Sequence, residues 1–132
     1  MKKNNLSAQE EASNYFKLAY ANEESGNHKK AIEYYEKSLK IAREIGHKEG
    51  ESICCANLGV AYGNLGEYRK AIEYLEESLK TVEAIEDKET EFTCYRNLSV
   101  LYRNIGEYSK AKEYFEKSLK ISVNINERKE RF

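Results

Sequence analysis

The sequence predicts an all-α solenoid of three helix–turn–helix units, because its residues repeat at a period of 40. Four residue types keep this step through all three units: Gly26, Gly66, Gly106, Ala31, Ala71, Ala111, Tyr34, Tyr74, Tyr114, Ser38, Ser78 and Ser118. Residues 51–86 and 91–126 are identical at 19 of 36 aligned positions. A unit this short cannot bury its apolar face alone, so consecutive units must stack around one continuous core.

Each unit is predicted to hold two helices joined by a glycine turn. In the second helix of the first unit, apolar residues fall at 31, 32, 35, 39 and 42, which is the spacing of one helical face. Gly66 and its equivalents follow the first helices, where glycine adopts the left-handed conformation that ends a helix. The predicted helices span 8–25, 28–45, 48–65, 68–86, 88–105 and 108–126. They form one domain over 1–132, with repeats at about 8–46, 48–86 and 88–126 and a tail at 127–132.

Charged pairs four residues apart mark the predicted solvent-facing side of the second helices. They include Glu33 with Lys37, Glu36 with Lys40, Glu76 with Lys80, Glu113 with Lys117 and Glu116 with Lys120. Pairs of this kind stabilise a helix by only about 0.2–0.5 kcal/mol each. They therefore indicate a solvated face and not an active site.

The composition narrows the class of protein. Charged residues make up 34% of the chain while the net charge is −1, which argues against general nucleic-acid binding. No apolar run approaches the roughly 20 residues of a membrane span. The three cysteines, Cys54, Cys55 and Cys94, are an odd number, and we expect them to be reduced packing residues of a cytoplasmic protein.

We find no pattern that predicts an enzyme, a metal site or a cofactor. The only histidines are His28 and His47, and neither has a cysteine or carboxylate at metal-ligand spacing. The only aspartate, Asp87, lies in a predicted loop. There is no glycine-rich phosphate loop and no recognisable nucleophile motif.

The repeated residues resemble the tetratricopeptide repeat family over about residues 8–126. The matching positions are Asn57, Leu58, Gly59, Tyr62, Gly66, Tyr68, Ala71 and Leu75, and in the third unit Asn97, Leu98, Tyr102, Gly106, Tyr108, Ala111 and Phe115. The period is 40 rather than the family's usual 34, no proline follows the second helix, and Cys55 stands where an aromatic is usual. The long period is similar to that of repeats in G-protein-signalling modulators, kinesin light chains and bacterial regulatory proteins. The resemblance implies a right-handed superhelix that serves as a scaffold or adaptor for protein partners.

The same resemblance implies a concave groove lined by the first helices, which we expect to bind an extended peptide. The expected groove residues are Lys17, Tyr20, Asn57, Val60, Asn64, Arg96, Asn97, Arg103 and Asn104. Equivalent asparagines such as Asn57 and Asn97 form a ladder of amides that can hydrogen-bond a peptide backbone. Arg96 and Arg103 lie two turns apart on one helix, which favours an acidic peptide or a terminal carboxylate.

Other interpretations of these residues remain open. The asparagines could bond to a neighbouring helix instead, and the arginines could be ordinary surface charges. The clamp that binds chaperone tails in this family is only partly matched, because Phe16 and Tyr20 replace the expected lysine and asparagine.

A second hypothesis places an interface on the last predicted helix. Phe115, Leu119 and Val123 form an apolar stripe that no following unit covers. An exposed stripe of this kind marks an interface. We expect either self-association into a homodimer through this helix or a place within a longer array of repeats.

Overall fold

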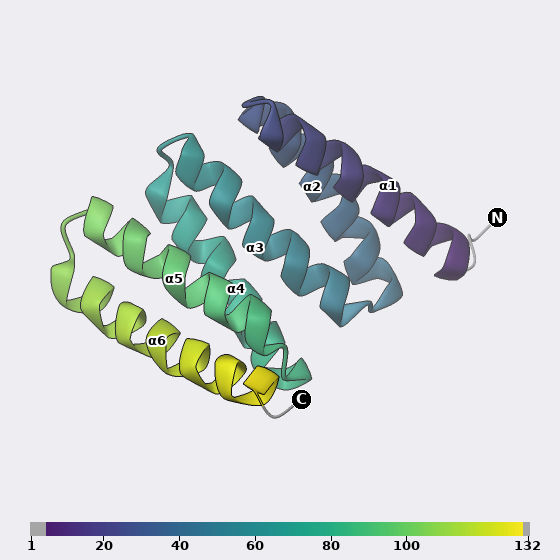
Figure 1. Ribbon diagram of the computed structural model, residues 1–132. Helices are drawn as coiled ribbons and strands as arrows, with labels where there is room; N and C mark the ends of the chain where they lie inside the picture. Colours follow the sequence, from purple (N-terminus) through teal and green to yellow (C-terminus); the bar gives the residue numbers. More distant parts are fainter. Residues whose placement is uncertain (1–4, 131–132) are drawn as a thin grey trace.

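The structure is a computed structural model that describes residues 5–130, with side chains described for residues 7–126. The described chain consists of six helices: α1 (Asn5–Glu24), α2 (His28–Ile45), α3 (Lys48–Asn64), α4 (Tyr68–Ile85), α5 (Lys88–Asn104) and α6 (Tyr108–Glu130). Figure 1 shows them as three pairs stacked in chain order, with α1, α3 and α5 side by side in one layer. The prediction of an all-α helical repeat is confirmed.

The predicted and observed helix bounds differ mainly at the two ends of the chain. Helix α1 begins at Asn5, three residues before the predicted start. Helix α6 continues to Glu130, four residues beyond the predicted end at 126. The first four residues of the predicted tail therefore belong to α6, and 131–132 lie outside the described residues.

Each pair of helices is joined by a turn that satisfies the last carbonyl groups of the first helix. Gly66 adopts φ 81° and its N–H donates to Gly63 O at 3.0 Å, while Glu67 N donates to Tyr62 O at 3.0 Å. This pair of hydrogen bonds is the Schellman motif, which needs a left-handed residue at its centre. The turns at 26 and 106 have the same bonds, so the glycine period sets where each unit folds back.

The core is one continuous cluster that runs through all three units. Its largest fully buried side chains include Tyr35, Leu58, Leu75 and Leu98. Gly59 lets α3 approach α4, because a Cβ at this position would lie 2.6 Å from Leu75 Cγ. This close approach explains why a helix interior carries a glycine despite a cost of about 1 kcal/mol relative to alanine.

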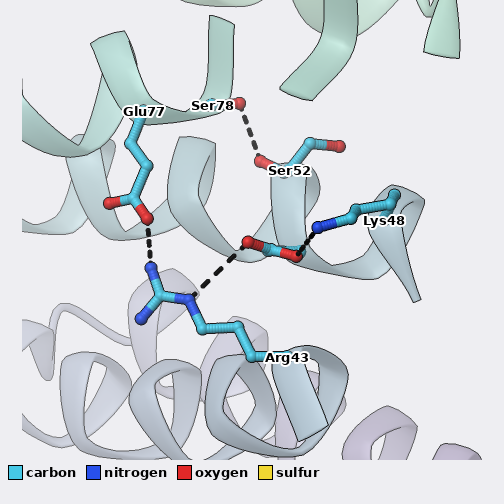
Figure 2. A network of polar contacts seen from close by, with 6 residues as sticks. Arg43, Lys48, Ser52, Glu77 and Ser78 are labelled. Carbon is cyan, nitrogen blue, oxygen red and sulfur yellow. Dashed lines mark hydrogen bonds and ion pairs between the residues drawn. The ribbon is translucent and has the colours of Figure 1, made fainter. Parts of the chain in front are cut away.

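A polar network joins the first unit to the second (Figure 2). The Arg43 guanidinium, near the end of α2, donates to the Glu77 carboxylate on α4, and its Nε lies 3.7 Å from Glu51 Oε1 on α3. Lys48 Nζ lies 3.4 Å from the other oxygen of Glu51. A single arginine thus bridges two helices of the next unit, although its exposed ion pair with Glu77 contributes at most about 1 kcal/mol.

Most of the predicted glutamate–lysine pairs of the second helices are not formed. Only Glu113 and Lys117 lie within ion-pair distance, at 3.7 Å, among the pairs predicted in the described chain. Glu36 instead accepts a hydrogen bond from Tyr62 Oη at 3.1 Å, and Glu76 accepts one from Tyr102 Oη at 2.9 Å. The tyrosine of the following unit outcompetes the lysine because a buried hydroxyl needs a partner, whereas an exposed ammonium is solvated.

These tyrosines make stability sensitive to alkaline pH. Burial, with the nearby glutamates, raises the pKa of Tyr35, Tyr62 and Tyr102 above the usual value. A raised folded pKa means that the stabilisation is intact at neutral pH and is lost from about pH 10 upward, where unfolded tyrosines ionise. We expect the melting temperature, followed by circular dichroism, to fall steadily above pH 10. Replacing both Tyr62 and Tyr102 with phenylalanine should make the melting temperature fall less steeply with pH. An unchanged slope would contradict the assignment of the alkaline destabilisation to these two tyrosines.

The three cysteines are free and buried, and their thiols are expected to be unreactive in the folded protein. Burial raises the pKa of Cys55 to about 12 and that of Cys94 to about 11, and it also raises the pKa of Cys54. Since the thiolate is the reactive form, we expect none of the three to react with a thiol reagent at pH 8 in the folded protein. All three should react in denaturant. Rapid labelling without denaturant would show that the stack opens more readily than its packing implies.

Candidate protein-interaction surface

A shallow groove follows the line where α3 and α5 lie against each other. It has a volume of about 130 Å3 and is lined by Gly59, Val60, Gly63, Asn64, Asn97, Val100, Leu101 and Asn104. We call it the seam groove. Four of the nine residues predicted to bind a peptide line it, namely Val60, Asn64, Asn97 and Asn104.

The predicted asparagine ladder is uneven. Asn57 Nδ2 donates to Ile53 O at 2.9 Å, and Asn57 Oδ1 accepts from Tyr35 Oη at 3.5 Å. In the next unit, Leu75 occupies the position of Tyr35 and offers no hydroxyl. The Asn97 amide oxygen consequently lacks the hydroxyl that Asn57 accepts from. Its nitrogen also donates to no other described residue, and the amide is available to a ligand.

The second pair of asparagines differs in the same way. Asn64 Nδ2 donates to Glu23 Oε1 at 2.6 Å, and that oxygen also lies 2.8 Å from Nδ1 of His28. Asn104 is the equivalent of Asn64 in the third unit, and Gly63 of the second unit stands where the first unit has Glu23. Within the described chain, the side chain of Asn104 therefore has no hydrogen-bond partner. Of the four predicted amides, the two on α5 are therefore free and the two on α3 are used inside the protein.

The two predicted arginines lie in a different groove, on the outer side of the last unit. This end groove has a volume of about 480 Å3 and is lined by Arg96, Ser99, Val100, Arg103, Tyr108, Ala111, Lys112 and Phe115. Arg96 and Asn97 are neighbours in sequence, but neighbouring side chains on a helix point about 100° apart. Val100 lines both grooves and separates the arginines from the free amides.

Lys17 and Tyr20 are exposed on α1 and line neither groove. A third groove, which the sequence did not predict, lies between α1, the second half of α2 and the first half of α3 and has a volume of about 520 Å3. Its lining is mostly apolar and includes Phe16, Ala42, Ile45 and Ile53. The signal that could have revealed it is the pair Phe16 and Ile53, which are apolar residues on the first helices of the first two units.

The apolar stripe of α6 is exposed. Phe115, Leu119 and Val123 retain 51%, 49% and 55% of their accessible surface. The equivalent residues Leu75 and Leu79 of the second unit are buried under the third unit. The last unit thus carries an open face where the other units carry a covered one.

The described residues offer no group of three or more histidine, cysteine or acidic side chains that could hold a metal ion. None of the helices described here is both long and apolar enough to cross a membrane.

Comparison with known proteins identifies the family. The sequence profile of the tetratricopeptide repeat matches residues 9–84 and, overlapping them, 52–122. The chain belongs to the tetratricopeptide repeat family. No curated protein matches the chain.

Solved structures of other tetratricopeptide repeat proteins share the fold. The tetratricopeptide repeat domain of Arabidopsis FLU superposes with a TM-score of 0.85 at 18% identity, over 89% of this chain and 98% of that one. BtubC (BKLC) from P. vanneervenii superposes with a TM-score of 0.79 at 29% identity, over 86% of this chain and 46% of that one. A signal transduction ATPase from Pyrococcus horikoshii with a tetratricopeptide repeat sensor gives a TM-score of 0.80 at 30% identity, over 90% of this chain and 19% of that one.

Family membership indicates the general role of the chain. Tetratricopeptide repeats are protein–protein interaction scaffolds, and the family is typically without catalytic activity. The grooves of this repeat protein are accordingly candidate contact surfaces for a protein partner.

Proposed function

We propose that this protein is a cytoplasmic adaptor that holds an extended segment of a partner protein along its seam groove. The observation that carries the proposal is the pair of free amides on α5. Asn97 and Asn104 are seven residues apart, about two helical turns, and neither is used inside the described protein. Each amide offers two donors and an acceptor, which suits the backbone of an extended peptide.

The apolar residues of the seam groove support the same mode of binding. Val60 on α3 and Val100 on α5 line the groove together with both free amides. A peptide backbone could bond to the amides while alternate side chains contact the valines. The preference for acidic segments rests on Arg96 and Arg103, which lie on the far side of Val100 and would meet carboxylates that extend past it.

The proposal is tested by peptide selection on the whole protein. The wild type is used to select binders from a library of displayed extended peptides, and the affinities of the selected peptides are then measured. Replacing Asn97 and Asn104 with alanine is expected to weaken binding at least about tenfold, the loss expected when two net hydrogen bonds of about 1 kcal/mol are removed.

A matched control removes two other amides. Asn14 on α1 and Asn124 on α6 are exposed and line none of these grooves, so their replacement with alanine should leave the affinities unchanged. Absence of any selected peptide, or equal loss in both double variants, would overturn the assignment of the seam groove. Asn57 is avoided because its bond with Tyr35 would confound binding with stability.

Self-association is a second candidate function, favoured by the exposed stripe of Phe115, Leu119 and Val123. If the stripe pairs with another copy, replacing Phe115 and Leu119 with glutamate should convert a dimer into a monomer. Light scattering across a concentration series measures the mass. A wild type that is already monomeric at the highest concentration excludes this candidate.

A further inference from the structure

The end groove has a shape that suits a bound helix, because a helix covers the same eight positions in the preceding unit. We call this covered face of the second unit the covered seat. The eight equivalents in the second unit are Ala56, Gly59, Val60, Gly63, Tyr68, Ala71, Ile72 and Leu75. None of these eight is exposed, because α5 of the third unit packs over this face. The third unit presents the corresponding face without a described helix on it, at the lower edge of the stack in Figure 1.

The end groove differs from the covered seat in its charge. Arg96, Arg103 and Lys112 stand where the second unit has Ala56, Gly63 and Ile72. None of the eight residues that line the end groove is acidic. Three cations around the apolar side chains of Val100 and Phe115 are complementary to a helix that is apolar along one face and carries carboxylates beside it.

Arg103 also limits which residue of a bound helix can lie against the end groove. At the covered seat, a Cβ on Gly63 would lie 3.2 Å from Leu101 Cδ2, so the next helix approaches the backbone closely there. The long side chain of Arg103 occupies this space on the end groove. A helix with a leucine at the matching position, like α5, therefore does not fit in the same register without moving.

The first two units show which residue of a seated helix would reach Arg103. Asn64 on α3 bonds to Glu23 of the first unit, and Glu23 is the equivalent of Arg103. The charge at this position is thus inverted in the third unit. A carboxylate in place of the Asn64 amide would meet Arg103, and a second carboxylate seven residues earlier would lie toward Arg96.

We propose that the end groove binds an acidic amphipathic α-helix of a partner protein, with carboxylates seven residues apart that pair with Arg96 and Arg103. Apolar residues of this helix cover Val100 and Phe115. The proposal deepens the adaptor function by naming a helix as a bound element, but it does not depend on the amides of the seam groove.

A second copy of this chain fits the end groove less well. If α1 of another copy took the seat in the register of α3, Glu24 would occupy the place of Asn64 and would meet Arg103. Lys17, seven residues earlier, would then lie toward Arg96, which is seven residues before Arg103. Two like charges at one of the two pairing positions disfavour this arrangement.

The test uses a peptide built from the helix that fills the equivalent seat inside this chain. The peptide is residues 48–65, with Cys54 and Cys55 changed to alanine and with Asn57→Glu and Asn64→Glu. A lactam bridge on its solvent-facing side keeps it helical, because an isolated helix of this length is marginal in water. Its affinity for the full chain is measured by fluorescence anisotropy and compared with that of the bridged peptide that keeps both asparagines.

We expect the glutamate peptide to bind at least about tenfold more tightly than the asparagine peptide, as two charge-assisted hydrogen bonds allow. The advantage should shrink with added salt. In the chain with Arg96→Ala and Arg103→Ala the two peptides should bind alike. Both arginines are exposed, so this variant should keep its helical content, and circular dichroism checks that it does.

A matched control removes two positive charges elsewhere. Lys40 and Lys80 are exposed on α2 and α4, outside the end groove, and their replacement with alanine should leave the tenfold preference in place. Equal affinity of the two peptides for the wild type, no binding of either, or a preference that survives in the arginine variant would overturn the proposal. If the wild type forms a dimer that Glu24→Lys converts into a monomer, the occupant of the end groove is a second copy of the chain and the proposal is wrong.

The two proposals fail separately. The variant with Asn97→Ala and Asn104→Ala is expected to lose selected extended peptides and to keep the helical peptide. If it loses both, the end groove and the seam groove act as one site and the separate assignment of the helix is wrong.

Discussion

Replacing Leu75 with alanine is expected to lower the free energy of unfolding by about 2–5 kcal/mol, the range found for a buried leucine. Leu75 lies on α4 and is completely buried between the second and third units. The truncation removes apolar contact and leaves a cavity that the flanking helices fill only in part. Chemical denaturation followed by circular dichroism measures the change.

The matched control is Phe115→Ala, because Phe115 is the equivalent of Leu75 in the third unit. Phe115 retains about half of its accessible surface, so we expect its truncation to cost no more than about 1 kcal/mol. A loss as large as that at Leu75 would show that this face is covered in solution. The pair of variants therefore tests both the core and the openness of the end groove.

The fold could be predicted from the sequence because its signals are local. Gly66 and its equivalents close each unit with a left-handed turn, and the apolar stripe of each second helix shows which face is buried. The end of α4 is an exception. Glu86 takes the left-handed conformation with φ 57°, although the equivalent residue of the first unit is Gly46. No local pattern predicts a glutamate there, and the helix still ends with the hydrogen bond from Asp87 N to Val82 O at 3.2 Å.

The candidate site was predicted only in part because its residues depend on contacts between units. The repeat correctly indicates that Asn57 and Asn97 occupy equivalent positions. It does not indicate that a hydroxyl from Tyr35 reaches one of them while Leu75 leaves the other free. A change at one position of a neighbouring helix decides whether an amide is structural or available.

The separation of Arg96 from Asn97 has a different cause. The sequence prediction placed Arg96 and Asn97 in one concave groove, yet neighbouring residues of a helix point about 100° apart. Arg96 consequently faces the outer side of the last unit, and Asn97 faces α3. The helical period alone implies that the two lie on different sides of α5, but which groove each side faces follows only from how α3 and α6 flank it.

Replacing Gly59 with valine is expected to destabilise the middle of the stack by about 3 kcal/mol, the upper part of the usual range for an overpacked core. A Cβ at this position would lie 2.6 Å from Leu75 Cγ and 3.1 Å from Ala71 O, and valine adds two further methyl groups. Gly63→Ala is the control one turn away. Its Cβ meets only the end of the Leu101 side chain closely, at 3.2 Å, and the gain in helix propensity of about 1 kcal/mol offsets that contact.

The clash at Gly59 and the cavity at Leu75 should compensate each other. In the chain with both Gly59→Val and Leu75→Ala, the valine methyl groups enter the space that the leucine leaves, and the total volume changes little. We expect the double variant to be more stable than the sum of the single losses by about 1–3 kcal/mol in a double-mutant cycle. Rescue stays incomplete because the contact with Ala71 O involves the backbone of α4, which the leucine truncation does not move. Strict additivity would mean that α3 and α4 already stand further apart at this point than their packing indicates.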